Sequence, residues 1–124
     1  MLEDLKKTLW ATADKLVVVS DVHPACTGAD FDTCTKKKVE EKGENVRVYD
    51  KLFVRHWDSW NDGRRSHLFL VAATPKSTAP PRDLTRGMDA DVPSLPFGGD
   101  EEYTFSPDGK SVVFAARAAG REEA

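Results

Sequence analysis

The stretch FSPDGKSVVFAAR, residues 105–117, decides how this chain folds. In its SPDG turn, Pro107 presets φ for the first central position, Asp108 can bond to its own backbone, and Gly109 can take the positive φ that a side chain resists. The alternating segment EEYTF, residues 101–105, precedes the turn, and the apolar segment SVVFAAR follows it. A strong turn between two strand-like segments predicts a β-hairpin.

A second segment has the same layout as this hairpin. WATADKLVVV, residues 10–19, can be laid over FSPDGKSVVF, residues 105–114. Each begins with an aromatic residue and continues through a turn and a lysine into an apolar strand. The offset of 95 residues fits two propeller blades of ~40–50 residues each. The repeat fits two propeller hairpins and also fits any two β-hairpins with good turns. We expect an all-β chain, a partial β-propeller of about two to two and a half blades of antiparallel strands.

Other segments also have the features of strands and turns. KLVVVSDV (15–22) and SHLFLVA (66–72) are short and apolar, which predicts buried strands. RDLT (82–85) is the best strand candidate in a stretch rich in Pro, Gly, Ser and Asp. The NDG sequence at 61–63 predicts a turn.

Two short helices are expected besides the strands. Residues 1–9 carry leucines at helical spacing, which predicts an amphipathic helix. After a loop at 24–34, the charged residues 35–44 predict a solvated, inserted helix. We expect the chain to divide into a blade remnant (1–22), an insertion (23–45), blade strands (46–73), and a loop with a hairpin blade (74–124).

The composition of the chain excludes several classes of partner. The 124 residues carry a formal net charge of −3, so no basic field points to nucleic acid or to an anionic membrane. No apolar run approaches the ~20 residues that a membrane helix needs. The N-terminal residues lack the apolar core of a signal peptide, so the chain as written is expected in the cytoplasm.

The two cysteines lie in a turn-rich loop. Cys26 and Cys34 are eight positions apart, and such a loop can bring their Cα atoms to the ~5.5 Å that a disulfide needs. A disulfide and a pair of reduced thiols are both compatible with this pattern. Two cysteines and one nearby histidine, His23, fall short of the four ligands of a zinc site. No metal and no other cofactor is expected.

Polar and aromatic residues gather most densely just before and after the NDG turn. One cluster comprises Arg55, His56, Trp57, Asp58 and Trp60. It could line a propeller channel or face another domain, or it could simply pack at a blade junction. Arg64 and Arg65 could bind a peptide carboxylate through paired guanidinium contacts, or could be solvated at the turn.

Acidic residues offer a weaker candidate for metal binding. Asp89 and Asp91, with Asp100 and Glu101 nearby, could bind calcium. Their spacing is not that of an EF-hand loop, which favours a solvated acidic loop.

Several stretches resemble one family of proteins. FSPDGKSVVFAAR resembles the hairpin that recurs in the propellers of TolB-like proteins and of prolyl oligopeptidase family peptidases. VSDVHPAC, KLFVRHWDSWNDGRRSHLFLV and RDLTRGMDADVPSLPFGGDEEYTFSPDGK resemble, in order, bacterial dipeptidyl-peptidase and acylaminoacyl-peptidase-like members. The resemblance covers roughly residues 10–124. It implies a propeller that precedes an α/β-hydrolase domain, restricts access to the active site and helps to select short peptides.

The chain departs from that family in one plain respect. It contains no G-x-S-x-G nucleophile elbow, and Ser66 is not followed by the required glycine. No room remains for a hydrolase domain, so we expect no catalytic residue here and a chain truncated on both sides. The resemblance implies two partners, the hydrolase domain of the parent peptidase and short peptides. It also implies a periplasmic or secreted parent, in which the Cys26–Cys34 disulfide would be favoured.

Two other functions remain open from the sequence. The chain could be a free-standing TolB-like propeller module that binds proteins. It could also be a small enzyme that uses His56 and Asp58, although nothing in the sequence supplies a nucleophile elbow or an oxyanion hole.

Overall fold

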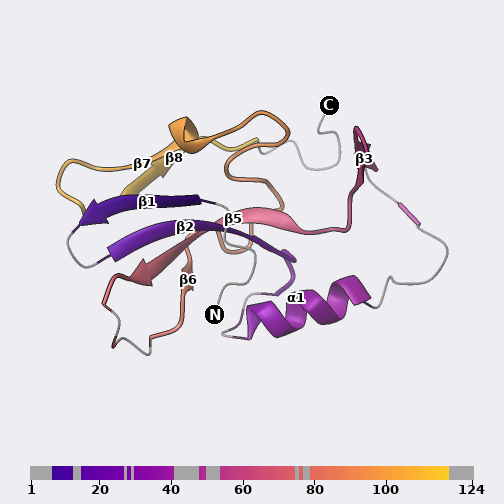
Figure 1. Cartoon of the computed structure of the whole chain (residues 1–124), viewed down its shortest axis with the longest axis horizontal. Helices are drawn as coiled ribbons and strands as arrows, with labels where there is room; N and C mark the ends of the chain where they lie inside the picture. The colour runs from indigo at the N-terminus through magenta and orange to yellow at the C-terminus, as the bar shows by residue number, and fades with distance from the viewer. Residues whose placement is uncertain are drawn as a thin grey trace.

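The central feature of the computed structural model is a four-stranded antiparallel sheet with the order β1-β2-β5-β6 (Figure 1). The strands span Lys7–Thr12, Lys15–Val22, Arg65–Ala72 and Arg82–Asp83. The structure describes residues 7–12, 15–26, 28, 30–40, 48–49, 54–74, 76 and 79–117.

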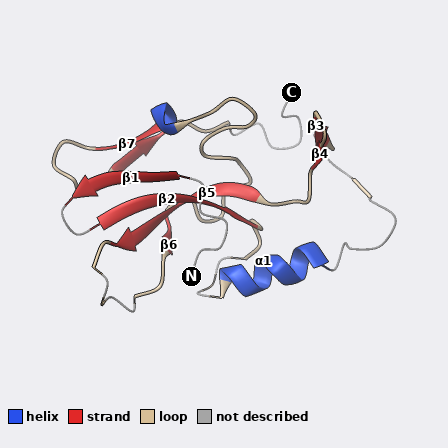
Figure 2. Cartoon of the chain, in the orientation of Figure 1, coloured by secondary structure: helices blue, strands red, loops and turns tan. Residues whose placement is uncertain are grey.

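The remaining elements are short (Figure 2). They are the helix α1 (Phe31–Glu40), the hairpin strands β3 (Arg55–His56) and β4 (Ser59–Trp60), the 3-10 helix η1 (Asp100–Glu102), and the hairpin strands β7 (Tyr103–Phe105) and β8 (Val112–Phe114). No helix in the described ranges is long and apolar enough to cross a membrane.

Strands β2 and β5 form the centre of the sheet. They pair over eight residues each, from Lys15 opposite Ala72 to Val22 opposite Arg65. Successive side chains in a strand point to opposite faces, so a strand that is apolar at every position needs cover on both faces. The valine run of β2 therefore requires a second layer above the sheet and another below it.

Both faces of the sheet are covered, as Figure 1 shows. One buried cluster consists of Val17, Val19, Leu68, Val92 and Tyr103, and β7 and β8 pack against it. The other consists of Val18, Val22, Cys26, Phe31 and Phe69, and includes the first residue of α1. The rings of Phe31 and Phe69 stack with centroids 4.7 Å apart.

A disulfide joins the loop after β2 to α1. Cys26 and Cys34 are bonded, with their Cα atoms 5.8 Å apart. Because Cys26 is buried in the second cluster, the bond holds the first turn of α1 against the sheet.

The N-terminal segment and the helix both differ from the expectation. Lys7–Thr12 forms strand β1, not the end of a helix over 1–9, because it pairs with β2. Residues 1–6 lie outside the described ranges. Helix α1 begins at Phe31 rather than at residue 35, because burial of Phe31 against the sheet favours an earlier start.

The strand predictions at 15–22 and 66–72 are confirmed by β2 and β5, and RDLT supplies the short β6. In EEYTF only the last three residues are strand, since η1 takes up the first two. The NDG segment forms a bend in which Asn61 Oδ1 accepts a hydrogen bond from Gly63 N at 2.8 Å.

The central sheet joins strands from two of the expected segments of the chain. Strand β2, from the segment 1–22, and strand β5, from the segment 46–73, lie side by side in it. Between β2 and β5, the described residues of the segment 23–64 add no strand to this sheet, and we call this segment the excursion. Over the described residues, the sheets are small and do not close on one another.

Candidate functional site

The hairpin β3–β4 presents the densest exposed aromatic surface of the described residues. Arg55 pairs with Trp60 and His56 with Ser59, which places Trp57 and Asp58 in the connecting turn. Trp57 has a φ of 47°, a left-handed conformation that is rare for a large side chain.

Aromatic and guanidinium groups extend this surface on both sides of the turn. Trp57 is 73% exposed and meets Phe97, itself 79% exposed, edge to face with ring centroids 5.7 Å apart. The Arg55 guanidinium lies 5.4 Å from the centroid of the Trp60 ring, and Tyr49 stacks on the same ring. We call Tyr49, Arg55, Trp57, Trp60 and Phe97 the hairpin surface.

The chemistry of the hairpin surface suits a protein interface better than a free surface. Aromatic residues and arginine are enriched at the centres of interfaces, and exposed apolar patches mark interaction sites. Of the predicted cluster, the hairpin holds four exposed residues, namely Arg55, Trp57, Asp58 and Trp60. The side chain of His56 lies outside the described part of the structure.

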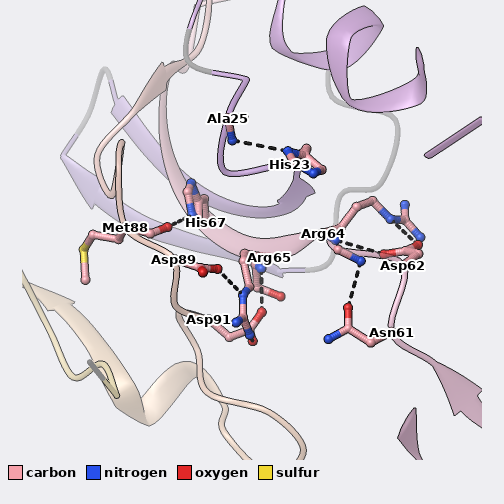
Figure 3. A network of polar contacts seen from close by, with 12 residues as sticks. His23, Ala25, Asn61, Asp62, Arg64, Arg65, His67, Met88, Asp89 and Asp91 are labelled. Atoms are coloured by element: carbon pink, nitrogen blue, oxygen red, sulfur yellow. Dashed lines mark hydrogen bonds and ion pairs between the residues drawn. The ribbon is translucent and has the colours of Figure 1, made fainter. Parts of the chain in front are cut away.

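A buried polar network anchors the beginning of β5 (Figure 3). Arg65 Nε donates to Asp89 Oδ1 at 2.9 Å, and Arg65 Nη1 donates to Asp91 Oδ2 at 3.0 Å. Asp91 Oδ1 also accepts a hydrogen bond from Ser66 N at 2.8 Å. The two aspartates considered as calcium ligands therefore bind an arginine, and the described residues hold no cluster of three or more metal-ligating side chains.

Arg64 and Arg65 form ion pairs with different carboxylates. Arg64 Nε donates to Asp62 Oδ2 at 2.7 Å, whereas Arg65 binds the two aspartates of the 89–91 loop (Figure 3). Both guanidiniums are engaged within the chain, so a peptide carboxylate could bind them only by displacing these partners.

His67 is the buried histidine of the network. Its Nδ1 lies 2.8 Å from Asp83 Oδ2, and its Nε2 lies 3.0 Å from the carbonyl oxygen of Met88. Asp83 Oδ1 also accepts from Thr85 N at 2.9 Å. The ring therefore ties β5 to β6 and to the loop that follows β6.

The His67 contacts do not make a catalytic triad. A general base needs one free ring nitrogen beside the nucleophile, but both nitrogens of His67 face oxygen acceptors. The neighbouring Ser66 is buried, and its hydroxyl donates to Asp21 Oδ1 at 3.0 Å. The arrangement fixes a loop and offers no nucleophile.

Sequence reasoning missed His67, Asp83 and Thr85. His67 stood within an apolar strand, and Asp83 and Thr85 stood within the strand candidate RDLT (82–85). The available signal was the D-x-T pattern, since an aspartate commonly accepts from the backbone N–H two residues later.

The SPDG turn has the geometry that its sequence suggested. Gly109 has a φ of 68° and donates from its backbone N to Ser106 O at 2.9 Å. Hydrogen bonds from the Ser106 hydroxyl and from Lys110 N hold the pKa of Asp108 below its ordinary value. Pro107 and Asp108 are both exposed, so these turn residues serve the fold.

Comparison with known proteins relates the chain to one group of enzymes. It is 33% identical over 93 residues to a dipeptidyl-peptidase 5 of Arthroderma otae, 37% identical over 82 residues to that of Schizosaccharomyces pombe, and 31% identical over 71 residues to that of Porphyromonas gingivalis. These matches cover 70%, 59% and 57% of this chain. The chain is related to peptidases.

The relationship concerns only a small part of each relative. The chain spans 13%, 12% and 10% of the lengths of these three peptidases. No family model matches the chain, and no solved structure matches it.

Proposed function

We propose that this chain is a non-catalytic part of the β-propeller of a prolyl oligopeptidase family serine peptidase, where it helps to gate and select short peptides for an α/β-hydrolase domain. The proposal rests on one combined observation. The chain is similar to dipeptidyl-peptidases, yet its sequence contains no G-x-S-x-G elbow.

The sheet topology supports the propeller part of the proposal. Propeller blades are four-stranded antiparallel sheets, and β1, β2, β5 and β6 form such a sheet in sequential order. The hairpin β7–β8 then begins a separate sheet, as the first two strands of a following blade would. In this arrangement the excursion 23–64 is an insertion between the second and third strands of one blade.

The hairpin surface supports the gating part. The hairpin β3–β4 stands apart from the main sheet (Figure 1), and Trp57, Trp60 and Phe97 of the hairpin surface are exposed. Within a whole peptidase it would face the hydrolase domain or the peptide that enters between the domains. An exposed arginine on an aromatic ring suits contact with peptide backbone and carboxylate groups.

The disulfide supports a periplasmic or secreted parent. Disulfides persist in oxidising compartments and are rare in the cytosol, and Cys26–Cys34 links a loop to a helix within the insertion.

The proposal is tested on the gene with its flanking DNA. We expect the frame to continue into a G-x-S-x-G elbow, and the encoded enzyme to cleave dipeptidyl chromogenic substrates that the purified chain leaves intact. Flanking DNA without a hydrolase domain would overturn the proposal and favour a free-standing propeller module.

Gating itself is tested with hairpin variants of that enzyme. Trp57→Asn and Arg55→Gln are expected to change the ratio of kcat/KM between short and long peptides. Val113→Thr, at an exposed position of β8, is the control and should leave that ratio unchanged. Equal ratios in all three variants would remove the hairpin surface from substrate selection.

A further inference from the structure

A groove lies between the first turn of α1 and strand β6, away from the hairpin surface. Its cavity volume is about 460 Å³. The lining residues are Cys26, Gly28, Phe31, Pro80, Pro81, Arg82, Asp83 and Arg86. One wall is therefore the disulfide-bonded start of the helix, and the other is the edge of the sheet.

The two arginines of the groove differ from Arg64 and Arg65. Both Arg82 and Arg86 are exposed, and neither guanidinium has a hydrogen bond or ion pair within the part of the chain that the structure describes. Each guanidinium can therefore donate to an anionic ligand without breaking a hydrogen bond or ion pair within the described part of the chain.

The one acidic lining residue, Asp83, offsets only part of the arginine charge. Both oxygens of Asp83 are occupied, since Oδ2 faces His67 Nδ1 and Oδ1 accepts from Thr85 N. The N-terminal end of α1 adds the positive end of a helix dipole to the same wall. With two arginines and one aspartate, the lining side chains carry one net positive charge in a chain whose net charge is −3.

The apolar part of the lining favours a ligand that carries apolar as well as acidic groups. Phe31, Pro80 and Pro81 offer carbon surface beside the guanidiniums, and a bare inorganic anion would leave that surface in water. An acidic residue next to an apolar one would use both.

We propose that this groove binds a short acidic peptide segment, with Arg82 and Arg86 holding its carboxylates and Phe31 and the two prolines contacting an apolar neighbour. The site would act whether or not the chain belongs to a peptidase, because it uses only residues of this chain.

The test titrates the full chain with a peptide and observes backbone amide shifts by NMR. The probe is acetyl-Phe-Glu-Glu-amide, and the matched control peptide is acetyl-Phe-Gln-Gln-amide. We expect saturable shifts at Gly28, Arg82 and Arg86, with a dissociation constant of about 1 mM. The glutamine peptide should bind about tenfold more weakly, because it lacks the carboxylates.

Matched variants separate a specific site from general attraction between charges. Arg82→Gln/Arg86→Gln should weaken binding about tenfold. Lys37→Gln/Lys38→Gln removes the same charge from exposed positions in the last turn of α1 and should leave binding unchanged. If the arginine double variant does not fold, Arg86→Gln alone should weaken binding about threefold, since independent contributions add.

Three results would overturn the proposal. The first is an absence of saturable shifts with the glutamate peptide, and the second is an equal loss of affinity in the arginine and lysine variants. The third is inorganic phosphate binding as tightly as the peptide at equal ionic strength, which would make the groove a site for small anions.

Discussion

The ion pair between Arg65 and Asp91 gives the sharpest prediction about stability. Its side chains are only 10% and 9% exposed, and the nitrogen and oxygen are 3.0 Å apart. Replacing Arg65 with Met keeps a long apolar stem but removes the guanidinium. The Asp91 carboxylate then stays buried, with Ser66 N as its remaining described donor.

The expected cost follows from that burial. Removing one partner of a buried ion pair costs about 3–5 kcal/mol, because the other charge is left uncompensated. The Ser66 N–H still donates to Asp91, so we expect Arg65→Met to cost about 3 kcal/mol. Asp91→Asn should cost about 1–2 kcal/mol, since Arg65 keeps its contact with Asp89. The double variant buries no lone carboxylate, so the coupling energy should be about 1–3 kcal/mol.

The neighbouring pair Arg64–Asp62 is a matched control. Its contact is shorter, at 2.7 Å, but the side chains are 32% and 29% exposed. Water screens such pairs, and measured couplings are about 0.2–1 kcal/mol. The cycle of Arg64→Met with Asp62→Asn should fall in that range.

Urea unfolding of both cycles, followed by far-UV circular dichroism, measures the two couplings. Each variant must keep the m-value of the parent chain for its free energy of unfolding to be compared. A coupling for Arg65–Asp91 no larger than that for Arg64–Asp62 would refute the reasoning that burial, not distance, sets the strength of these pairs.

Three further predictions concern single features of the fold. The double variant Cys26→Ala/Cys34→Ala should lose about 2.5 kcal/mol of unfolding free energy through the closed loop of eight residues; urea midpoints with and without reductant check this. Gly109→Ala should cost about 1–2 kcal/mol, because φ is 68° there, which thermal unfolding measures. Hydrogen bonds from Ser94 N and Oγ hold the pKa of Glu102 below its ordinary 4.5. The lowered pKa stabilises the folded state above pH 4.5, and this contribution is lost as the pH falls through the folded pKa. Ser94→Ala should therefore make the free energy of unfolding depend less steeply on pH in this range.

Local patterns predicted individual strands well but could not order them. Residues 15–22 and 66–72 each carry enough apolar character to specify a strand. Their pairing joins segments more than 40 residues apart, and no local pattern encodes such a contact. For the same reason the helix predicted over residues 1–9 is wrong at residues 7–9, since only pairing with β2 makes them a strand.

The polar network was hidden from the sequence for a related reason. Asp89 and Asp91 lie in a segment with the composition of a solvated loop, where carboxylates usually face water. Their partner Arg65 lies more than 20 residues away, at the beginning of β5. Only the return of that loop along β5, where Val92 N donates to Ser66 O at 2.8 Å, makes the aspartates structural.

Trp57 combines two features that folding alone does not favour. Its φ of 47° costs about 1–3 kcal/mol for a residue other than glycine, and its indole is mostly exposed. The edge-to-face contact with Phe97 stabilises the fold by only about 0.5–1.5 kcal/mol. Asparagine tolerates positive φ, so Trp57→Asn should leave the unfolding free energy within about 1 kcal/mol of the parent or raise it.

This balance distinguishes a contact residue from a folding residue. If Trp57 is kept for an interface, Trp57→Asn spares stability and changes only the peptide selectivity of the whole enzyme. Phe97→Ser, which removes the same ring contact from the other side, should likewise spare the fold, because Phe97 is also exposed. A loss above about 2 kcal/mol in either variant, measured by urea unfolding, would make the hairpin surface part of the folding core and remove the argument for an interface.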